Sequence, residues 1–330
     1  MLEHVKNLGN QLLETLEKSS NFKSIQTQDV LIVGMGGSGV AGDVLKLAFD
    51  CYTEVNATVV KTYNIPQNLL SRNPHCLFLS YSGNTEETLS VLESAIKFNL
   101  EWSVVSSGGK LLNLAKEHKK SYVLVPNGLQ PRAAFGYMAK AALSYYPDKE
   151  KPHFEEECFE AGTYLNSLLS QEDRDLILYS NSIAKTINKK TSVIYGGTDL
   201  TYLVAQRWKT QINENSKSKA FVGFMPEVHH NEILSWESNK EESKNNYQLI
   251  FLRDENEHPQ VKKRFELTKE ILREMVDIIE IKNVGSSNIV KSIFHLTLIG
   301  DLVSVFIANE LNVDPYNIVS IEKLKSLLKG

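Results

Sequence analysis

The chain has 330 residues, a length that predicts two domains, and its 42% hydrophobic and 23% charged residues are ordinary for a globular protein. A formal net charge of -4 provides no basic field, so neither nucleic acid nor an anionic membrane is expected as a partner. No apolar run reaches the roughly 20 residues of a membrane span, and the charged N-terminus lacks a signal peptide's apolar core. The 3 widely spaced cysteines fit neither a disulfide framework nor a zinc knuckle, which favours a reducing cytoplasm.

The first half of the chain alternates short apolar runs with helical patterns. Runs rich in Val, Leu and Ile predict strands at residues 29–34, 55–61, 75–82, 102–107 and 121–126. Helix-like segments such as "TEETLSVLESAIKFN" lie between most of them. Near-continuous apolar strands that alternate with helices are typical of a parallel, doubly wound sheet.

The second half repeats this pattern after a change of composition. The charged stretch around residues 145–160 carries two prolines, and we interpret it as a linker. "TSVIYGGTDLTYLVAQRWK" then mirrors "VLIVGMGGSGVAGDVLK", "YQLIFLRDENE" mirrors "HCLFLSYSGNT", and "DIIEIKNVG" supplies another strand. The C-terminal stretch predicts helices interrupted near "NVDP". The predicted fold is therefore α/β, with two tandem doubly wound domains at residues 1–150 and 151–330, each a mainly parallel sheet flanked by helices.

A glycine-rich turn follows the first strand. Residues 34–39 satisfy G-x-G-x-x-G, but a dinucleotide site wants an acidic residue about 20 positions on, and Lys61 ends the second strand instead. A Walker loop also fails, because Val40 stands where that motif has Lys. Ser38, beside free backbone N–H groups at a helix N-terminus, suits a phosphate monoester. The alternative is a tight turn that only packs strand on helix.

The third strand ends in "SYSGNTEET", which places three hydroxyls around a glycine. The carboxyl ends of neighbouring parallel strands face one crevice, so these hydroxyls and the helix dipole near Asn84 can hold a dianion without Lys or Arg. A capping box between Asn84 and Glu87 is the alternative explanation of "NTEE", but it leaves the serines unexplained. The predicted phosphate-binding residues are Gly36, Gly37, Ser38, Ser80, Ser82 and Thr85.

These motifs together resemble a known family. "GMGGSGVAGD", "SYSGNTEET" and "SSGGKL" are similar to a sugar isomerase (SIS) domain, which binds phosphosugars. "PRAAFGYM", "QINENSKSKAF" and "PEVHHNEI" extend the resemblance to the bifunctional phosphoglucose/phosphomannose isomerase family, of the phosphoglucose isomerase superfamily, from about residue 25 to the C-terminus. The resemblance implies two SIS-type domains and an isomerase that interconverts glucose 6-phosphate, mannose 6-phosphate and fructose 6-phosphate through a cis-enediolate.

The resemblance also implies the catalytic residues. Glu214 would move the proton between C1 and C2, since burial can tune a carboxylate's pKa toward neutrality; taken alone, a Glu after a helix is usually solvated. Arg132 would stabilise the enediolate, although a surface turn is the alternative for this arginine. His230 would open the sugar ring, with its neighbour His229 as competitor. The C-terminal helix offers Lys325 as a further contact, with Lys323 as its alternative, and Ser320 as a candidate for the residue that admits both C2 epimers.

The resemblance further implies a homodimer in which His230 comes from the partner subunit. A hexose 6-phosphate is the expected substrate, in glycolysis and gluconeogenesis in the cytoplasm. Scattered histidines predict metal-independent catalysis, and no cofactor is expected. Gly196, Gly197 and Thr198 echo the first glycine turn, but "FLRDE" replaces "LSYSG", which predicts that the second copy has lost phosphate binding. The rival functions are a non-catalytic phosphosugar sensor and a glucosamine-6-phosphate-type isomerase.

Overall fold

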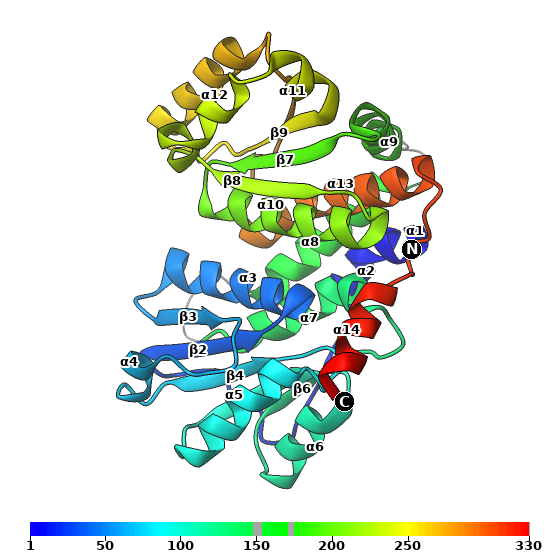
Figure 1. The fold of residues 1–330 in the computed structure, drawn as a ribbon. Helices are drawn as coiled ribbons and strands as arrows, with labels where there is room; N and C mark the ends of the chain where they lie inside the picture. The colour runs from blue at the N-terminus through cyan, green and yellow to red at the C-terminus, as the bar shows by residue number, and fades with distance from the viewer. Residues whose placement is uncertain (148–153, 171–174, 330) are drawn as a thin grey trace. The chain divides into compact units, whose positions relative to one another are not determined.

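The computed structural model describes residues 1–147, 154–170 and 175–329 (Figure 1). The chain divides into two compact units. The N-terminal unit comprises residues 7–167 and 286–294, and the C-terminal unit comprises residues 1–6, 168–285 and 295–330. The domain bounds expected from the sequence, 1–150 and 151–330, stay a prediction.

Within the described residues, the N-terminal unit contains a six-stranded sheet with the order β1-β6-β5-β4-β2-β3. Its strands are β1 (Glu17–Lys18), β2 (Asp29–Gly34), β3 (Asn56–Val60), β4 (His75–Leu79), β5 (Trp102–Ser106) and β6 (Tyr122–Leu124). All neighbours pair in parallel except β1, which is antiparallel to β6. The helices are α2 (Leu8–Leu13), α3 (Gly36–Tyr52), α4 (Gln67–Leu70), α5 (Glu86–Lys97), α6 (Gly109–Glu117), η1 (Pro131–Ala134), α7 (Phe135–Leu143) and α8 (Phe154–Leu168).

Helices cover both faces of this sheet, with α3 and α7 on one face and α5 and α6 on the other (Figure 1). Alternate strand residues such as Leu31, Phe78 and Val104 pack with Val91 and Leu92 of α5 in one buried apolar cluster. A sheet that is covered on both faces needs apolar residues on both sides of each strand. This explains why these strands read as continuous apolar runs.

The N-terminal sheet has a topological switch at β2. The chain runs from β2 to β3 on one side and then returns to β4 on the other side. The last residue of β2, Gly34, is therefore paired with Leu79 at the end of β4. In open α/β sheets, ligands bind at the carboxyl ends of the strands at such a point.

The C-terminal unit repeats this connectivity in a four-stranded parallel sheet with the order β10-β9-β7-β8. Its strands are β7 (Thr191–Gly196), β8 (Ala220–Phe224), β9 (Tyr247–Arg253) and β10 (Asp277–Lys282). The helices are α1 (Leu2–Lys6), α9 (Asp175–Ile187), α10 (Asp199–Gln211), η2 (Ile212–Ser216), η3 (Glu227–His230), η4 (Glu232–Trp236), α11 (Lys240–Asn246), α12 (Pro259–Leu272) and α14 (Val319–Lys329), with α13 (Ile289–Glu310) shared between the units. β7 pairs with β8 and β9 as β2 pairs with β3 and β4, so the predicted α/β fold with two parallel sheets is confirmed.

The segment expected to be a linker is partly helical. α8 begins at Phe154, and the preceding residues 148–153 lie outside the described residues. Phe154, Cys158, Ala161 and Leu165 are buried at helical spacing on one face of α8. The charges that suggested a linker occupy the remaining faces of this helix. The short strands β1 and β8 were not expected from the sequence.

One helix within the described residues, α13, is long and apolar enough by length and composition to cross a membrane, although charged residues interrupt its apolar run. This helix has 22 residues and a window with a mean hydropathy of 1.7. However, 83% of that window is buried within the protein. The core helix of a globular protein has the same length and composition, which makes α13 weak evidence for a membrane span.

Candidate functional site

The first turn of the candidate site joins β2 to α3. Gly36 begins the helix with a φ of +52°, a left-handed conformation that glycine adopts without steric cost. Met35 precedes the helix in an extended conformation and provides no side-chain cap. The first N–H groups of α3 have no acceptor within the helix itself. They therefore form a set of donors suited to an anion at the helix end.

Ser38 links this turn to the segment after β4. Its side chain is buried, and its Oγ accepts a hydrogen bond from the N–H of Tyr81 at 3.1 Å. A serine hydroxyl that accepts one bond still has its own proton to donate. The sequence gives no sign of this role for Tyr81, because an aromatic residue at a strand end resembles an ordinary core residue.

The second turn brings two of the predicted hydroxyls together. Ser80 is buried, and its Oγ lies 2.9 Å from Oγ1 of Thr85. Ser80 Oγ also accepts the N–H of Gly83 at 3.1 Å. Ser82 is exposed, and its Oγ accepts a backbone N–H two residues further on. The structure thus pairs the buried Ser80 with the half-buried Thr85 and places Ser82 at the surface of the same turn.

The expected capping box between Asn84 and Glu87 is wrong. α5 begins at Glu86 with Thr85 as its N-cap residue, and no side chain caps the helix. Asn84 lies outside the helix because Thr85 is extended, with φ -68° and ψ 120°. The Oδ1 of Asn84 instead accepts the N–H of Lys110 at 3.0 Å, which ties the second turn to a third one. The first turn of α5 therefore has no side-chain cap, like that of α3.

The third turn follows β5 and packs backbone against backbone on the second. A Cβ at Gly83 would lie 1.8 Å from the carbonyl oxygen of Gly108, and one at Gly109 would lie 2.4 Å from that of Ser82. Gly83 and Gly109 also have positive φ values, +66° and +72°, so a larger residue fits neither position. We call the three turns together the hydroxyl edge, which comprises residues 34–38, 80–85 and 106–109.

Arg132 lies beside the hydroxyl edge in the same unit. It belongs to η1 and is only 4% exposed. A Cβ built on Gly37 would lie 3.7 Å from the Cα of Arg132, so the backbone of η1 contacts the first turn of α3. The alternative of an arginine in a surface turn does not hold, since the side chain is buried. A buried guanidinium provides a fixed positive charge next to the predicted anion site.

Lys61 stands at the position where a dinucleotide-binding fold has its acidic residue. It forms an ion pair within the N-terminal unit. Its Nζ lies 2.6 Å from Oδ2 of Asp43 on α3. Burial raises the pKa of Asp43, and the charge of Lys61 opposes this rise. A lysine that neutralises its neighbour at this position does not fit the recognition of a ribose.

Glu214 lies in a π-helical turn at the end of α10, in the C-terminal unit. The flanking amides fix this turn, with Nδ2 of Asn215 donating to Ser304 at 2.9 Å and Nδ2 of Asn213 donating to the carbonyl of Ser218 at 2.9 Å. Lys217 ends the turn in a left-handed conformation with φ +57°. Single π-helical turns are frequent at functional sites. The half-buried Glu214 is thus held on a backbone that its neighbours fix.

The two candidate histidines differ in their surroundings. Both lie in η3, where His230 is exposed and His229 is half-buried. The ring of His229 contacts Thr268 through Nε2 at 2.7 Å and Arg264 through Nδ1 at 3.0 Å. His229 is therefore engaged within its own unit, whereas the ring of His230 faces outward.

The candidates of the C-terminal helix all lie on α14. Lys325, Lys323 and Ser320 are exposed. Side chains two positions apart on an α-helix are rotated by roughly 200° about the helix axis, so they point to nearly opposite sides. Only one of the two lysines can therefore face a given site. Among residues 1–147, 154–170 and 175–329, no group of three or more His, Cys, Asp or Glu side chains could hold a metal ion.

The β7–α10 turn of the C-terminal unit differs from its counterpart after β2. Oγ1 of Thr198 accepts the N–H of Thr201 at 3.1 Å. Oγ1 of Thr201 in turn accepts the N–H groups of Gly197 and Thr198, each at 2.9 Å. This capping box satisfies the donors that would otherwise bind an anion.

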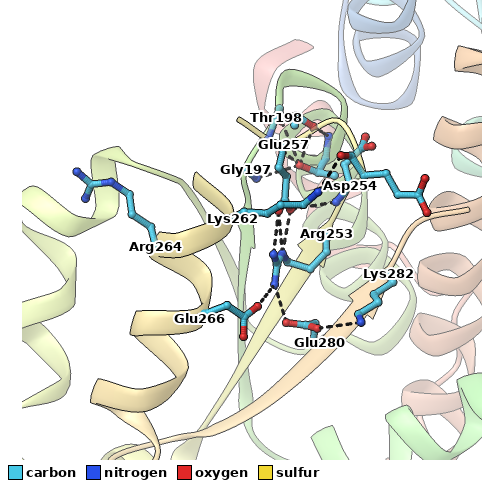
Figure 2. Close-up of polar contacts among 12 residues, drawn as sticks. Gly197, Thr198, Arg253, Asp254, Glu257, Lys262, Arg264, Glu266, Glu280 and Lys282 are labelled. Atoms are coloured by element: carbon cyan, nitrogen blue, oxygen red, sulfur yellow. Dashed lines mark hydrogen bonds and ion pairs between the residues drawn. The ribbon is translucent and has the colours of Figure 1, made fainter. Parts of the chain in front are cut away.

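Charged residues follow β9 where hydroxyls follow β4 (Figure 2). Nε and NH2 of Arg253 each donate to the carboxylate of Glu257 at 2.9 Å, and the N–H of Asp254 donates to the same carboxylate at 3.0 Å. Burial lowers the pKa of Arg253, but the hydrogen bonds that it donates to Glu257 and Glu266 outweigh this effect and raise the pKa. The chain supplies its own anion here, which supports the predicted loss of phosphate binding. We call this region the ion-pair edge, which comprises residues 196–201 and 253–257.

A cavity of about 280 Å³ opens beside the ion-pair edge. Its lining residues are Arg253, Asp254, Glu255, Lys262, Glu266, Glu280, Lys282 and Asn283. Most of these charges compensate one another: NH1 of Arg253 donates to Glu266 at 2.9 Å and to Glu280 at 2.8 Å. Such a lining does not single out one class of ligand.

Both halves of the chain match known domain families. Residues 25–107 match the SIS domain. Residues 179–328 match the bacterial phospho-glucose isomerase C-terminal SIS domain. The first match includes most of the hydroxyl edge, and the second includes Glu214, His230 and Lys325.

Similar proteins cover nearly the whole chain. This chain is 37% identical over 302 residues to the bifunctional phosphoglucose/phosphomannose isomerase of Aquifex aeolicus, and the alignment covers 91% of this chain and 90% of the relative. The bifunctional phosphoglucose/phosphomannose isomerase of Caldicellulosiruptor bescii is 30% identical over 337 residues, which are 99% and 98% of the two chains. A crystal structure of a hypothetical protein from Thermus thermophilus superposes with a TM-score of 0.74 at 15% identity, covering 99% and 86% of the chains. The last comparison shows the fold alone.

Proposed function

Because the chain belongs to the bifunctional phosphoglucose/phosphomannose isomerase family, we propose that it interconverts glucose 6-phosphate and fructose 6-phosphate, and also mannose 6-phosphate and fructose 6-phosphate. The observation that carries this function is the 37% identity to a relative of that name over 91% of the chain. Four relatives with this name are 30–37% identical over 91–99% of this chain. The non-catalytic sensor and the glucosamine-6-phosphate-type isomerase are therefore less well supported.

The substrate phosphate binds at the hydroxyl edge. The uncapped starts of α3 and α5 supply N–H donors and favourable helix dipoles. One hydroxyl of the Ser80–Thr85 pair donates its proton to the other, so the second hydroxyl keeps its proton for an anion. The proposed ligands of the phosphate are Gly36, Gly37, Ser38, Ser80, Ser82 and Thr85.

Catalysis begins with ring opening by His230. An imidazole can take the proton of the anomeric hydroxyl and return one to the ring oxygen near neutral pH. His230 acts from the partner subunit of a homodimer, and its exposed position on η3 suits this role. The open chain then carries a carbonyl at C1 in the aldose or at C2 in the ketose.

Glu214 carries out the isomerisation. Its carboxylate removes the proton from C2 of the aldose, and the C1 carbonyl becomes part of a cis-enediolate. A proton then passes from the C2 oxygen to the C1 oxygen, and Glu214 returns its proton to C1 to give the ketose. Arg132 stabilises the negative charge on the enediolate oxygens, and Lys325 contacts the sugar or the enediolate. The electron pair stays within the substrate, so no external redox cofactor is needed.

This function places the protein in carbohydrate metabolism, in glycolysis and gluconeogenesis, in the cytoplasm. Residues 1–150 form the phosphate-binding SIS domain. Residues 151–330 form the second SIS domain with the C-terminal helices, and they carry the proton-transfer residues.

A coupled assay tests the function. The purified protein is incubated with fructose 6-phosphate, and glucose 6-phosphate is measured by its oxidation while mannose 6-phosphate is measured by NMR. We expect both products. When the assay is run in D2O, we also expect deuterium at C2 of the products, because the enediolate takes up a proton there. Binding of fructose 6-phosphate without turnover would instead indicate a sensor.

Glu214→Gln tests the assignment of the base. We expect kcat to fall by about 100- to 10,000-fold with substrate binding retained, because general base catalysis typically contributes that much. The matched control is Glu274→Gln, since the Glu274 side chain is 76% exposed on the surface of the same unit. Normal turnover by Glu214→Gln would remove this residue from the mechanism.

A further inference from the structure

His229 forms hydrogen bonds that the proposed chemistry does not use. Its Nε2 lies 2.7 Å from Oγ1 of Thr268, and its Nδ1 lies 3.0 Å from NH1 of Arg264. Arg264 and Thr268 are four residues apart on α12, so one face of this helix meets both ring nitrogens. Thr268 is only 2% exposed, which places one of the two contacts in the interior.

The hydrogen bonds allow one arrangement of protons. A guanidinium only donates, so Nδ1 of His229 must accept from Arg264. The hydroxyl of Thr268 donates its proton to the carbonyl of Arg264 at 2.7 Å, so its oxygen must accept from Nε2–H of His229. His229 is therefore neutral, with its proton on Nε2. Burial, the charge of Arg264 and the neighbouring His230 all lower the pKa of His229, which favours this neutral form.

Arg264 serves His229 and does not belong to the ion-pair edge. Figure 2 shows its side chain pointing away from Arg253 and the carboxylates around it. We call the contact between His229, Arg264 and Thr268 the α12 latch.

The α12 latch holds His229 of η3, and the residues on both sides of His229 are also fixed by contacts within the C-terminal unit. Val228 is 3% exposed and packs in the apolar core of the C-terminal unit. Beyond His230, Oε1 of Glu232 accepts the hydroxyl of Tyr195 at 2.7 Å. His230 stands exposed between these anchors, so the direction of its side chain depends on the backbone that the latch holds.

We propose that His229 is a positioning residue that directs the His230 imidazole for opening of the sugar ring. This inference rests on the proposed function and on the role of His230 in it. Both ring nitrogens of His229 are engaged within one subunit, so His229 acts through the backbone of η3. A displacement of about 1 Å of a catalytic group can cost on the order of 100-fold in rate.

The test compares a cyclic substrate with an open-chain one. Fructose 6-phosphate closes its ring through the C5 hydroxyl, whereas 5-deoxyfructose 6-phosphate lacks this hydroxyl and stays open. The variants are His229→Leu and Thr268→Val, which remove the latch, and Thr268→Ser, which keeps its hydroxyl. His230→Gln serves as the reference for loss of ring opening, and thermal unfolding verifies that each variant is folded.

We expect His229→Leu and Thr268→Val to lower kcat for fructose 6-phosphate by about 10- to 100-fold, with KM within about twofold. Turnover of 5-deoxyfructose 6-phosphate should stay within about threefold of the wild type, because this substrate bypasses ring opening. Thr268→Ser should behave like the wild type, and His230→Gln should show the same selective loss.

Two results would overturn the inference while leaving the proposed function intact. Equal losses on both substrates would indicate a merely structural role for His229, and unchanged turnover of both would indicate no role. A wild type that converts neither substrate would instead overturn the proposed function itself. Equal losses on both substrates in His230→Gln would overturn the ring-opening role of His230, and the inference with it.

Discussion

The hydroxyl edge and the ion-pair edge occupy equivalent places in two sheets with the same connectivity, yet their chemistry is opposite. At the hydroxyl edge, α3 and α5 begin without side-chain caps, and Ser80 and Thr85 form a part-buried pair of hydroxyls. At the ion-pair edge, Thr198 and Thr201 cap α10, and Glu257 accepts hydrogen bonds from the guanidinium of Arg253 and from the N–H of Asp254. An edge binds an external anion only where the chain leaves its own donors unsatisfied.

The difference follows from a few residues on a common backbone plan. In both units a strand ends in glycine and leads into a helix, so a fold-level comparison would assign the same function to both. The replacement of "LSYSG" by "FLRDE" exchanges neutral donors for an internal salt bridge. Substitutions at the ion-pair edge should therefore change stability, and those at the hydroxyl edge should change substrate affinity.

The largest effect on stability is expected from Glu257→Gln. The Glu257 side chain is fully buried, and leaving a buried charge without its partner costs about 3–5 kcal/mol. Arg253 keeps Glu266 and Glu280 as partners, so we expect a loss at the lower end, about 3 kcal/mol. Urea unfolding measures this loss, while KM for fructose 6-phosphate should not change. The control is Glu266→Gln, whose carboxylate is 58% exposed and should cost less than about 1 kcal/mol. A raised KM in Glu257→Gln would place substrate at the ion-pair edge.

The N-terminal unit should be the more sensitive to acid, because of His75. Burial lowers the pKa of His75 to about 4, and the nearby Glu101 opposes this decrease. Above pH 6.5, the ordinary pKa of histidine, His75 is neutral in both the folded and the unfolded state, and the protein has its full unfolding free energy. As the pH falls toward 4, only the unfolded state takes up the proton, so the unfolding free energy decreases. The expected loss of unfolding free energy is about 3 kcal/mol, because a pKa difference of one between the folded and unfolded states corresponds to about 1.36 kcal/mol.

Urea unfolding of the wild type and His75→Gln at pH 7, 5.5 and 4 measures this loss. The variant should show a shallower decrease of stability between pH 6.5 and 4. Parallel curves for the two proteins would show that His75 does not titrate differently in the folded and unfolded states.

Ser80→Ala is expected to raise KM for fructose 6-phosphate by about 10- to 100-fold, since a hydrogen bond to a charged group contributes about 1.5–3 kcal/mol. The control at the ion-pair edge is Thr201→Val, which removes a hydroxyl from the β7–α10 turn. Steady-state kinetics should show an unchanged KM for that control. Similar KM values for the wild type and Ser80→Ala would contradict the assignment of the hydroxyl edge.

The smallest effect is expected from Thr198→Ala. Loss of an N-cap side chain costs about 1 kcal/mol, and the freed N–H groups of α10 become accessible to water. Thermal unfolding should show a small decrease in Tm, with turnover unchanged. A gain of phosphate binding at this turn would show that capping alone separates the two edges.

The sequence predicted the sheets well because their strands are buried on both faces. Residues 30–33 and 76–79 are apolar without interruption, and such runs have few alternatives. β8 was not predicted, because this strand has only five residues and its apolar Phe221 is exposed. The start of α8 was interpreted as a linker because three consecutive glutamates lie between its buried residues Phe154 and Cys158.

The site was predictable only as far as its chemistry is local in the sequence. The turn around Ser80 and Thr85 has its hydroxyls within five residues, and the structure brings them together. The bond from Tyr81 to Ser38 joins residues 43 positions apart. The α12 latch likewise depends on how α12 lies against η3, and no motif around His229 reveals it.

The most direct test of the central claim is a crystal structure of Glu214→Gln with fructose 6-phosphate bound. We predict that the phosphate accepts hydrogen bonds from the hydroxyls of Ser80 and Thr85 and from the first N–H groups of α3. A phosphate bound at the Gly197–Thr198 turn, or away from both edges, would contradict the account.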